Sequence, residues 1–491
     1  MQDVHQRMMS AIPLLANGRR RVPSAHTDHV RSRRRVALAL ATGMTLAGST
    51  AAVGAPMGRV TAGWPVFAPA QSSLHLGTDG GPVLVSDGLG SSLVAAWTPT
   101  GARRWINTFE WGCGNCAVLQ PDASRPGGPY GPLGPYGVRV VSPTGRSIPA
   151  YAVLADGTRI TIAWGATQTD ASTTTATRGS VQLWSRADPF LDEDRFDVSG
   201  GFVVTDGTRL YRGFGSTSTP TIALDATNGR ELWRVENARP LIPFGTGVLV
   251  QLANGHLAGF DAAGTALFEV PIAAPFPDAA HHRLYTSSPD RIDAYDTASG
   301  ALLWSRPRAR ALSVTPGGLV LAAITMGDRP ALQAIGADGV GRWRYETTMP
   351  VTSARALPDG TIVLAVNGVD PTNDAGLLMR INPAVAGVRP ERSSVALTRT
   401  TFRADCYDAA TMCGVSSSRG TMLRIASRTR TTMSVRLLFT NGTVMVPWTR
   451  ISVPVGTSLT RIAAGRATGR IQVRRGTAGS IIVDRRVTVT S

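Results

Sequence analysis

The chain has 491 residues, of which 43% are hydrophobic and 17% charged, with 53 glycines and 32 prolines. This length is too great for one ordinary compact core, and the composition excludes a disordered chain or one built mainly of membrane-spanning helices. Many glycines and prolines favour frequent turns, and therefore an all-β protein with short strands over a helical one.

The net charge of +17 is carried by arginine alone, because the sequence contains no lysine. Residues 1–59 have a net charge of +7, residues 60–395 of −2 and residues 396–491 of +12. The long middle of the chain is therefore close to neutral. Any role of the basic charge belongs to the two ends, and mainly to the C-terminal one.

The N-terminus has the pattern of a secretory signal. An arginine cluster, Arg31 to Arg35, precedes an apolar run from about Val36 to Ala47 and then a segment of small residues. This is the order of a charged region, an apolar region and a cleavage site. The apolar run is shorter than the ~20 residues that a membrane-spanning helix needs. We predict a signal peptide with a long charged region over residues 1–55, no transmembrane segment, and an exported protein that is extracellular or associated with the cell envelope.

The middle of the chain repeats one pattern: an alternating strand, a turn with Asp or Thr and Gly, and a second strand that closes on an aromatic residue. The clearest copies are "LDATNGRELW" (224–233), "FDAAGTALF" (260–268), "YDTASGALLW" (295–304) and "IGADGVGRW" (335–343). Alternation on both sides of a tight turn is typical of a β-hairpin. The predicted turn and packing residues are Asp225, Gly229, Trp233, Asp261, Gly264, Phe268, Asp296, Gly300, Trp304, Gly339 and Trp343.

A second turn, Asp-Gly or Asn-Gly, precedes the first in most copies, for example at Asp206-Gly207, Asn254-Gly255 and Asp359-Gly360. Each copy then offers about four short strands in some 35–45 residues, which is the size of one propeller blade. Weaker copies bring the number to about eight, with seven as the alternative. The sequence therefore predicts a seven- or eight-bladed β-propeller over residues 60–394, with the closing aromatics packed between blades.

A strand that ends in Ala, a hydrophobic residue and Asp, followed by xxxGxxxW, resembles the pyrroloquinoline-quinone-like (PQQ-like) repeat propellers over roughly residues 63–392. The lead-in "GWPVFAPAQSS" (63–73) is also similar to that family. Within it, the chain looks closest to the non-enzymatic members that resemble outer-membrane-assembly lipoproteins. The resemblance implies a non-catalytic scaffold that contacts a protein or an envelope polymer, and we expect the chain to be a monomer.

The same family contains quinone-dependent dehydrogenases that oxidise alcohols or sugars with PQQ and calcium, and this remains the alternative function. The alcohol-oxidising branch needs two adjacent cysteines, whereas Cys113 and Cys116 are separated by two residues. The loop with Asp370, Asn373 and Asp374 has the side chains to hold a cation, but a lone acidic loop is more often only solvated. The pair His281-His282 lacks the spacing of a metal-binding helix. We therefore predict no catalytic, cofactor-binding or metal-binding residue.

After Arg392 the turn-and-aromatic pattern stops, but short alternating strands continue. Residues 395–491 predict a small Ig-like β-sandwich, which carries the charge of +12. Its few aromatics, among them Phe439 and Trp448, indicate no stacking platform for nucleic acid. The charge either keeps the domain soluble or anchors it to an anionic envelope polymer or lipid headgroups.

The four cysteines form two close pairs, Cys113 with Cys116 and Cys406 with Cys413. In an exported protein, two local disulfides are the expected use of such pairs. A redox, haem or zinc role is disfavoured by the surrounding residues.

Overall fold

The computed structural model of the chain describes residues 57–60, 66–68, 73–76, 80–87, 91–110, 117–118, 139–141, 147–149, 152–163, 172–188, 202–213, 217, 219–271, 273–327, 329–369, 376–387, 389–403, 406–408, 412–413, 421–462 and 468–490. All of these belong to one compact unit, residues 50–491. The predicted signal peptide, Cys113, Cys116 and the acidic loop with Asp370 and Asp374 lie outside the described residues. Among the described residues, no helix has the length and apolar character needed to cross a membrane.

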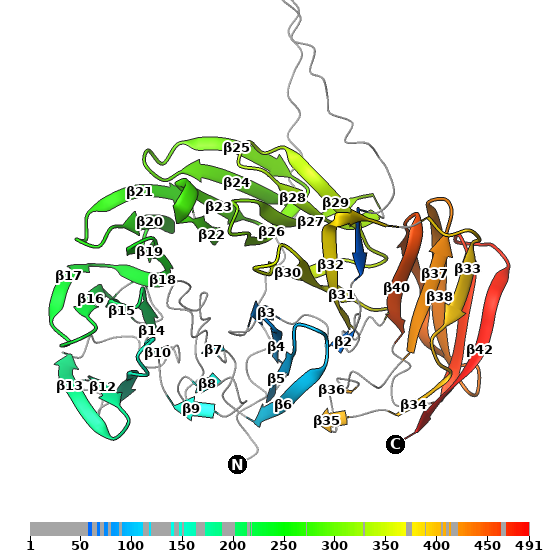
Figure 1. Ribbon diagram of the computed structural model, residues 1–491, viewed down its shortest axis with the longest axis horizontal. Helices are drawn as coiled ribbons and strands as arrows, with labels where there is room; N and C mark the ends of the chain where they lie inside the picture. The colour runs from blue at the N-terminus through cyan, green and yellow to red at the C-terminus, as the bar shows by residue number, and fades with distance from the viewer. Residues whose placement is uncertain are drawn as a thin grey trace, which may run out of the picture. The chain divides into compact units, whose positions relative to one another are not determined.

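Antiparallel four-stranded sheets recur along the chain, each made of strands that follow one another in sequence (Figure 1). Six such sheets are formed by β3 (Ser73–Leu76) to β6 (Arg103–Glu110), β10 (Ala152–Val153) to β13 (Val181–Asp188), β14 (Phe202–Thr205) to β17 (Glu231–Val235), β18 (Ala238–Phe244) to β21 (Ala266–Pro271), β22 (Ala274–Asp278) to β25 (Leu302–Pro307), and β26 (Ala309–Val314) to β29 (Gly341–Glu346). Their inner strands are β4 (Pro82–Asp87), β5 (Ser91–Trp97), β11 (Arg159–Ala163), β12 (Ser172–Arg178), β15 (Arg209–Gly213), β16 (Thr221–Asp225), β19 (Gly247–Leu252), β20 (His256–Phe260), β23 (Arg283–Ser287), β24 (Arg291–Asp296), β27 (Val320–Met326) and β28 (Arg329–Ile335). These sheets are the blades of a β-propeller, which confirms the predicted all-β fold.

The last blade is completed by a strand from the other end of the chain. β30 (Val351–Ala356), β31 (Ile362–Asn367) and β32 (Gly376–Ala386) pair in order, and β1 (Met57–Val60) pairs antiparallel with β32. β2 (Val66–Ala68) also pairs with β32, at Gly376–Leu378. Because residues more than three hundred positions apart share one sheet, this pairing couples the start of the propeller to its end.

A three-stranded sheet of β7 (Ala117–Val118), β8 (Arg139–Val141) and β9 (Ser147–Pro149) lies in sequence between β6 and β10. It occupies the place of a weak copy of the repeat, "SPTGRSIP" (142–149), that has lost its closing aromatic. Between β1 and β32, the described residues thus form seven sheets of at least four strands and this smaller one, in line with the prediction of seven or eight blades.

Burial falls from the inner strands of a blade to its last strand. On β19 and β24 four consecutive residues are buried, whereas burial alternates along the last strand β17. Two adjacent blades cover both faces of an inner strand, so its sequence reads as a continuous apolar run. The last strand packs on one face only and keeps the alternation of a half-exposed strand.

The Asp-Gly and Asn-Gly turns, which looked equivalent in sequence, belong to two different connections. Asp206-Gly207 and Asp359-Gly360 join the first and second strands of a blade, whereas Asn254-Gly255 joins the second and third. The second kind of turn therefore lies at the opposite end of its blade from the first. Sequence spacing alone could not separate them, because both follow an alternating strand of similar length.

Residues 394–490 form a two-sheet module. One sheet contains β33 (Ser394–Leu397), β37 (Thr421–Ser427) and β40 (Gly456–Ile462). The other has the order β34 (Thr401–Arg403), β42 (Ile481–Thr490), β41 (Gly469–Arg475), β38 (Thr431–Phe439) and β39 (Val444–Val453), with β34 parallel to β42. Buried side chains from both sheets, such as Leu423, Ile425, Val435 and Val473, share one core.

The module is joined to the last two blades by apolar packing and hydrogen bonds. Val369 and Met349, from the blades, pack into the core of the module. The Thr348 hydroxyl donates to the Leu459 carbonyl (3.1 Å), and the Val369 N–H donates to the Arg461 carbonyl (3.0 Å). Module and propeller therefore share buried surface and are expected to fold together.

Candidate functional site

The closing tryptophans of three repeats bind the turn of the following blade. Each indole N–H donates to a backbone carbonyl in the turn between the third and fourth strands of that blade, at 2.8–3.0 Å. The donor and acceptor pairs are Trp184 with Ala226, Trp233 with Ala262, and Trp304 with Ala337. The predicted closing aromatics therefore lie at contacts between blades.

The glycine of each turn lies under the tryptophan that docks there. A Cβ atom on Gly229 would come within 2.5 Å of the Trp184 ring, and one on Gly264 within 2.7 Å of Trp233. Both glycines have φ near +70° to +85°, a region that side chains disfavour. Gly339 has the same position beneath Trp304, and Gly300 lies close to Phe268. Trp343 packs instead at the edge of the core of the last two blades.

The turn aspartates bind their own turns. A carboxylate oxygen of Asp225 accepts the Thr227 N–H (2.8 Å), and Asp261 accepts the Ala263 N–H (2.9 Å) in the same way. Hydrogen bonds from the Thr227 side chain and backbone hold the pKa of Asp225 below its usual value. Asp296 makes the equivalent bonds to Ala298 and Ser299. These aspartates thus stabilise separate turns and do not converge on a common site.

Two arginines link the last blade to its neighbours. Arg355 on β30 donates to the Leu312 carbonyl of the preceding blade (2.9 Å) and to the Leu74 carbonyl of the first (3.0 Å). Arg380 on β32 donates to the Thr361 hydroxyl (2.8 Å) and to the Pro99 carbonyl in a turn of the first blade. Arg380 thus binds the turn between the third and fourth strands of the next blade, which tryptophan binds elsewhere.

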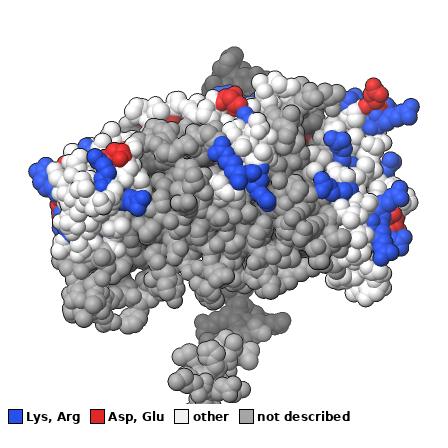
Figure 2. Space-filling view, turned by 60° about the horizontal axis from the view of Figure 1, so that its bottom comes forward, with Lys and Arg blue, Asp and Glu red and all other residues white. Residues whose placement is uncertain are grey.

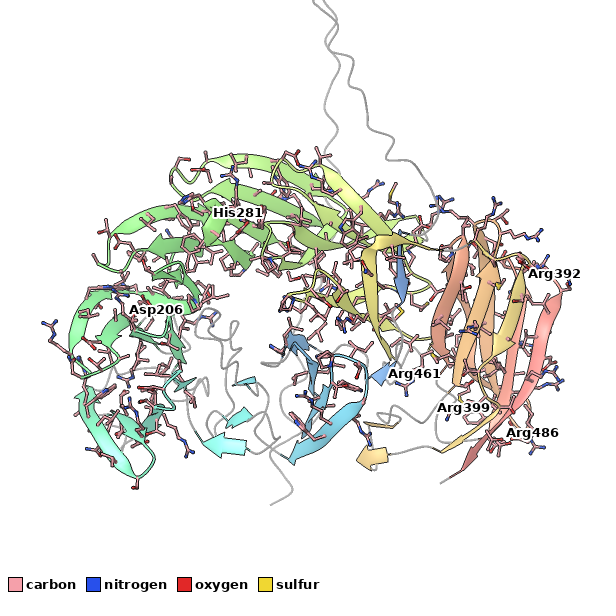
Figure 3. All side chains as sticks on the ribbon, viewed as in Figure 1. Asp206, His281, Arg392, Arg399, Arg461 and Arg486 are labelled. Atoms are coloured by element: carbon pink, nitrogen blue, oxygen red, sulfur yellow. The ribbon has the colours of Figure 1, made fainter. Side chains whose placement is uncertain are left out.

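His281 contacts an acidic side chain that sequence spacing did not single out. Its Nδ1 lies 2.7 Å from Asp278 Oδ1. Burial, together with the charge of Asp278, raises the pKa of Tyr285 to about 12. Two blades earlier, the Tyr211 hydroxyl donates to Asp206 (3.0 Å), and Figure 3 labels Asp206 and His281. Within the described part of the chain, no three His, Cys, Asp or Glu side chains are grouped to hold a metal.

The outer strands of four successive blades expose a leucine at the same place in the repeat, directly before the closing aromatic. Leu183, Leu232, Leu267 and Leu303 are each 37–43% exposed. Alternation explains the exposure, since the aromatic points toward the neighbouring blade and the residue before it points away. The propeller therefore presents regularly spaced apolar side chains on its outer strands.

The five-stranded sheet of the module has one face in the core and one that carries arginines, named here the arginine face: Arg436, Arg450, Arg470, Arg474, Arg486, Asp484 and Trp448. On β38, Met433, Val435 and Leu437 are buried in the core, so Arg436 between them lies on the opposite face. Ladder pairing brings the others to the same side, with Arg450 and Arg474 both opposite Ser434 and Arg486 opposite Arg470. Figure 2 shows blue side chains gathered on this module, at the right of the view.

A tryptophan holds two of these arginines in place. The Arg474 and Arg436 guanidinium carbons lie 4.0 and 4.6 Å from the centre of the Trp448 ring. Arg436 Nε also donates to Gln472 Oε1 (2.7 Å), and Gln472 Nε2 donates to Asp484 (2.9 Å). Stacking and hydrogen bonds restrict the rotamers of these long side chains before any ligand arrives.

Asp484 is the one acidic residue in the described strands of this sheet. Desolvation alone would raise its pKa, but hydrogen bonds from Arg470 and Gln472 and the charges of Arg470 and Arg436 keep the pKa below its usual value. Asp484 is thus ionised at neutral pH and offsets a single arginine. Arg470 and Arg486 lie directly opposite each other in the ladder, and Arg470 is the arginine that Asp484 pairs with.

The other sheet of the module is the one that contacts the propeller. Met422 and Leu459, from β37 and β40, pack against the core of the last two blades. Arg461 on β40 is buried, and its Nη1 lies 3.4 Å from the Gly376 carbonyl. Figure 3 labels Arg461 on β40 and Arg486 on β42, at opposite sides of the module. Since a sandwich has two outer faces and the propeller covers one, the arginine face is the one left to solvent.

Sequence reasoning had located the charge in this part of the chain but had treated Trp448 as an isolated aromatic. The register of three strands, β41, β38 and β39, brings Trp448 close to both Arg436 and Arg474, which are 38 residues apart. Of the predicted cysteine pairs, Cys406 and Cys413 are direct register partners in the two-stranded sheet of β35 (Cys406–Asp408) and β36 (Met412–Cys413). Their disulfide stays a prediction.

Of the comparisons with known proteins, the family model is the one that bears on the repeat. Residues 223–403 match the family model described as outer membrane protein assembly factor BamB. No curated protein matches the chain in a sequence search. Solved structures similar to the chain include BamB from Moraxella catarrhalis (14% identity, 62% of this chain and 84% of that chain, TM-score 0.32) and Sqt1 from Saccharomyces cerevisiae (12%, 63% and 83%, TM-score 0.35).

A third is BBS1N in complex with ARL6DN (13% identity, 68% of this chain and 97% of that chain, TM-score 0.36). TM-scores this low carry no argument about function. The matched residues 223–403 are a little over a third of the chain, and they contain all four of the clearest repeats. The predicted resemblance to PQQ-like repeat propellers is therefore confirmed over this segment.

Proposed function

We propose that the chain is an exported, non-catalytic β-propeller scaffold that the arginine face attaches to an anionic surface of the cell envelope. The observation that carries the proposal is the composition of that face, on which five arginines are offset by Asp484 alone. A concentrated positive surface on a chain whose middle is neutral favours attraction to a polyanion over mere solubility.

The propeller supplies the scaffold part of the proposal. The tryptophan and arginine hydrogen bonds connect neighbouring blades, so the outer strands form a rigid surface. Leu183, Leu232, Leu267 and Leu303 give those strands a regular set of apolar contacts for a protein partner. The similarity of residues 223–403 to a family of assembly factors supports protein binding in general terms.

Binding of the full chain to isolated cell envelopes tests the proposal. Co-sedimentation is measured at low and high salt for the native chain and for a variant with Arg436→Gln, Arg450→Gln and Arg474→Gln. We expect the native chain to sediment with envelopes at low salt and to be released at high salt, because screening weakens exposed charge contacts. The arginine-face variant is expected to stay in the supernatant.

A matched control removes the same charge elsewhere. Arg178, Arg329 and Arg342 lie on blades and are exposed, so their joint replacement by Gln lowers the net charge equally. Equal loss of binding in both variants would reduce the effect to net charge and contradict the proposal. Deleting the module is a poorer test, because Val369 and Met349 would lose their packing partners.

A further inference from the structure

The arginine face also carries apolar side chains at two of its ends. Val444 on β39 is 50% exposed and lies opposite Leu438 in the ladder, and Ile481 on β42 is 45% exposed and lies opposite Arg474. Opposite residues in a ladder project from the same face of the sheet. Basic and apolar groups are therefore interspersed on one surface instead of being separated.

This mixture distinguishes two kinds of anionic partner. A dissolved polyanion is held by charge alone and leaves exposed Val and Ile side chains in water. A lipid headgroup layer offers phosphates to guanidinium groups and, just beneath them, an apolar environment for short aliphatic side chains. Half-buried Trp448, between two arginines, has the amphipathic character of residues found at that depth.

The arrangement of these arginines suits the binding of an external phosphate better than ion pairing with carboxylates of the protein itself. Arg436 and Arg474 are oriented by Trp448, whereas Asp484 pairs with Arg470 and leaves Arg486, opposite it in the ladder, for an external anion. Guanidinium groups bind phosphate oxygens through two parallel hydrogen bonds, which favours phosphate-bearing headgroups.

We infer that the arginine face binds the headgroup layer of an anionic phospholipid membrane, with Arg436, Arg450 and Arg474 on lipid phosphates and Val444 and Ile481 inserted just below them. The inference rests on the proposed function and names the surface to which the scaffold attaches. It places the five-stranded sheet flat on the membrane and keeps the outer strands of the propeller accessible.

The test uses the full chain and vesicles of phosphatidylcholine with or without phosphatidylglycerol. We expect binding to the anionic vesicles that falls with salt, and little binding to phosphatidylcholine alone. Replacing Arg436 and Arg474 by Gln should lower the affinity for anionic vesicles roughly thirtyfold, since each basic residue near such a surface contributes about a factor of five. Replacing the exposed blade residues Arg329 and Arg342 by Gln should change it much less.

A second pair of variants separates a membrane from a soluble polymer. Val444→Ser with Ile481→Ser leaves every charge in place, so it should weaken vesicle binding several-fold and leave binding to soluble polyphosphate unchanged. Trp448→Leu should weaken both, because the two arginines lose their orientation. Circular dichroism confirms that each variant is folded.

Four outcomes would overturn the inference. Equal binding to neutral and anionic vesicles would do so, as would a Val444/Ile481 variant with native affinity for vesicles. Salt-sensitive binding to isolated envelopes without any binding to anionic vesicles would also reject it while leaving the proposed function intact. If the chain binds neither envelopes nor vesicles, the proposed function and the inference are both rejected.

Discussion

At the scale of single residues, the closing tryptophan combines two contacts that a smaller side chain lacks. The Trp184 ring covers Gly229 of the next blade, and its N–H satisfies the Ala226 carbonyl. The ring fills the space above the glycine, and its N–H pairs a backbone oxygen of the same turn. The packing of the ring therefore depends on the conformation of that turn. Each such residue therefore stabilises two blades at once.

Replacing Trp184, which is 8% exposed, by Ala should lower the free energy of unfolding by about 3–5 kcal/mol, because it leaves a cavity and an unpaired carbonyl. Urea unfolding measures the change. Leu183, its neighbour on the same strand, is 41% exposed and provides the matched control, with an expected loss below about 1 kcal/mol for Leu183→Ala. Similar losses for both variants would argue against tryptophan docking.

His75 on β3 should make stability depend on pH. Burial, and then the charge of Arg355, lower the pKa of His75 from 6.5 to about 4. In the unfolded chain His75 binds a proton below pH 6.5, whereas in the folded protein it does so only near pH 4. The stability that neutral His75 contributes is therefore complete above pH 6.5 and is lost as the pH falls toward 4.

The loss over this range should reach at most about 3 kcal/mol. Thermal unfolding between pH 4 and 7 measures it, with His75→Gln expected to flatten the profile. A His75→Gln profile as steep as that of the native chain would show that other groups set the pH dependence.

At the scale of elements, β1 has only four residues, but its pairing with β32 protects the edge of the last blade. β1 is the outermost partner of β32, and the Met57–Val60 backbone supplies the hydrogen bonds of that edge. Without it, an apolar strand of the last blade would offer unpaired N–H and C=O groups to other chains.

Two shortened chains, one beginning at Pro56 and one at Thr61, isolate this contribution. The chain that lacks β1 should be less stable by about 2–4 kcal/mol, at about 1 kcal/mol for each lost ladder hydrogen bond, and more prone to self-association. Urea unfolding and analytical ultracentrifugation compare the two. Equal stability and equal monomer content would contradict a closing role for β1.

The two-stranded sheet of β35 and β36 should carry a disulfide. Cys406 and Cys413 are direct partners in the β35–β36 ladder, and opposite residues of an antiparallel pair have Cα atoms about 4.5–5.5 Å apart. That spacing lies within the range that a disulfide bridges. Peptide mass spectrometry without reduction should find Cys406 linked to Cys413, whereas free thiols or a link to Cys113 or Cys116 would show the pairing to be wrong.

At the scale of the whole molecule, the repeat was readable from the sequence because its signals are local. The Asp, the Gly and the closing aromatic lie within ten residues of one another, and each has a role in its own turn or in the next blade. Other contacts join distant segments, such as the pairing of β1 with β32 and the hydrogen bond from Arg355 to Leu74. No local sequence pattern predicts them. The arginine face likewise depends on the register of several strands.

In the proposed attachment, one surface, the arginine face, contacts the envelope and the outer propeller strands stay free. Hydroxyl-radical footprinting of the full chain, with and without isolated cell envelopes, tests this most directly, because it reports the accessibility of individual side chains. We expect labelling of Trp448, Val444 and Ile481 to fall when envelopes are added, and labelling of Leu232 and Leu303 to stay unchanged. Protection of the propeller leucines with Trp448 unaffected would contradict it and assign attachment to the blades.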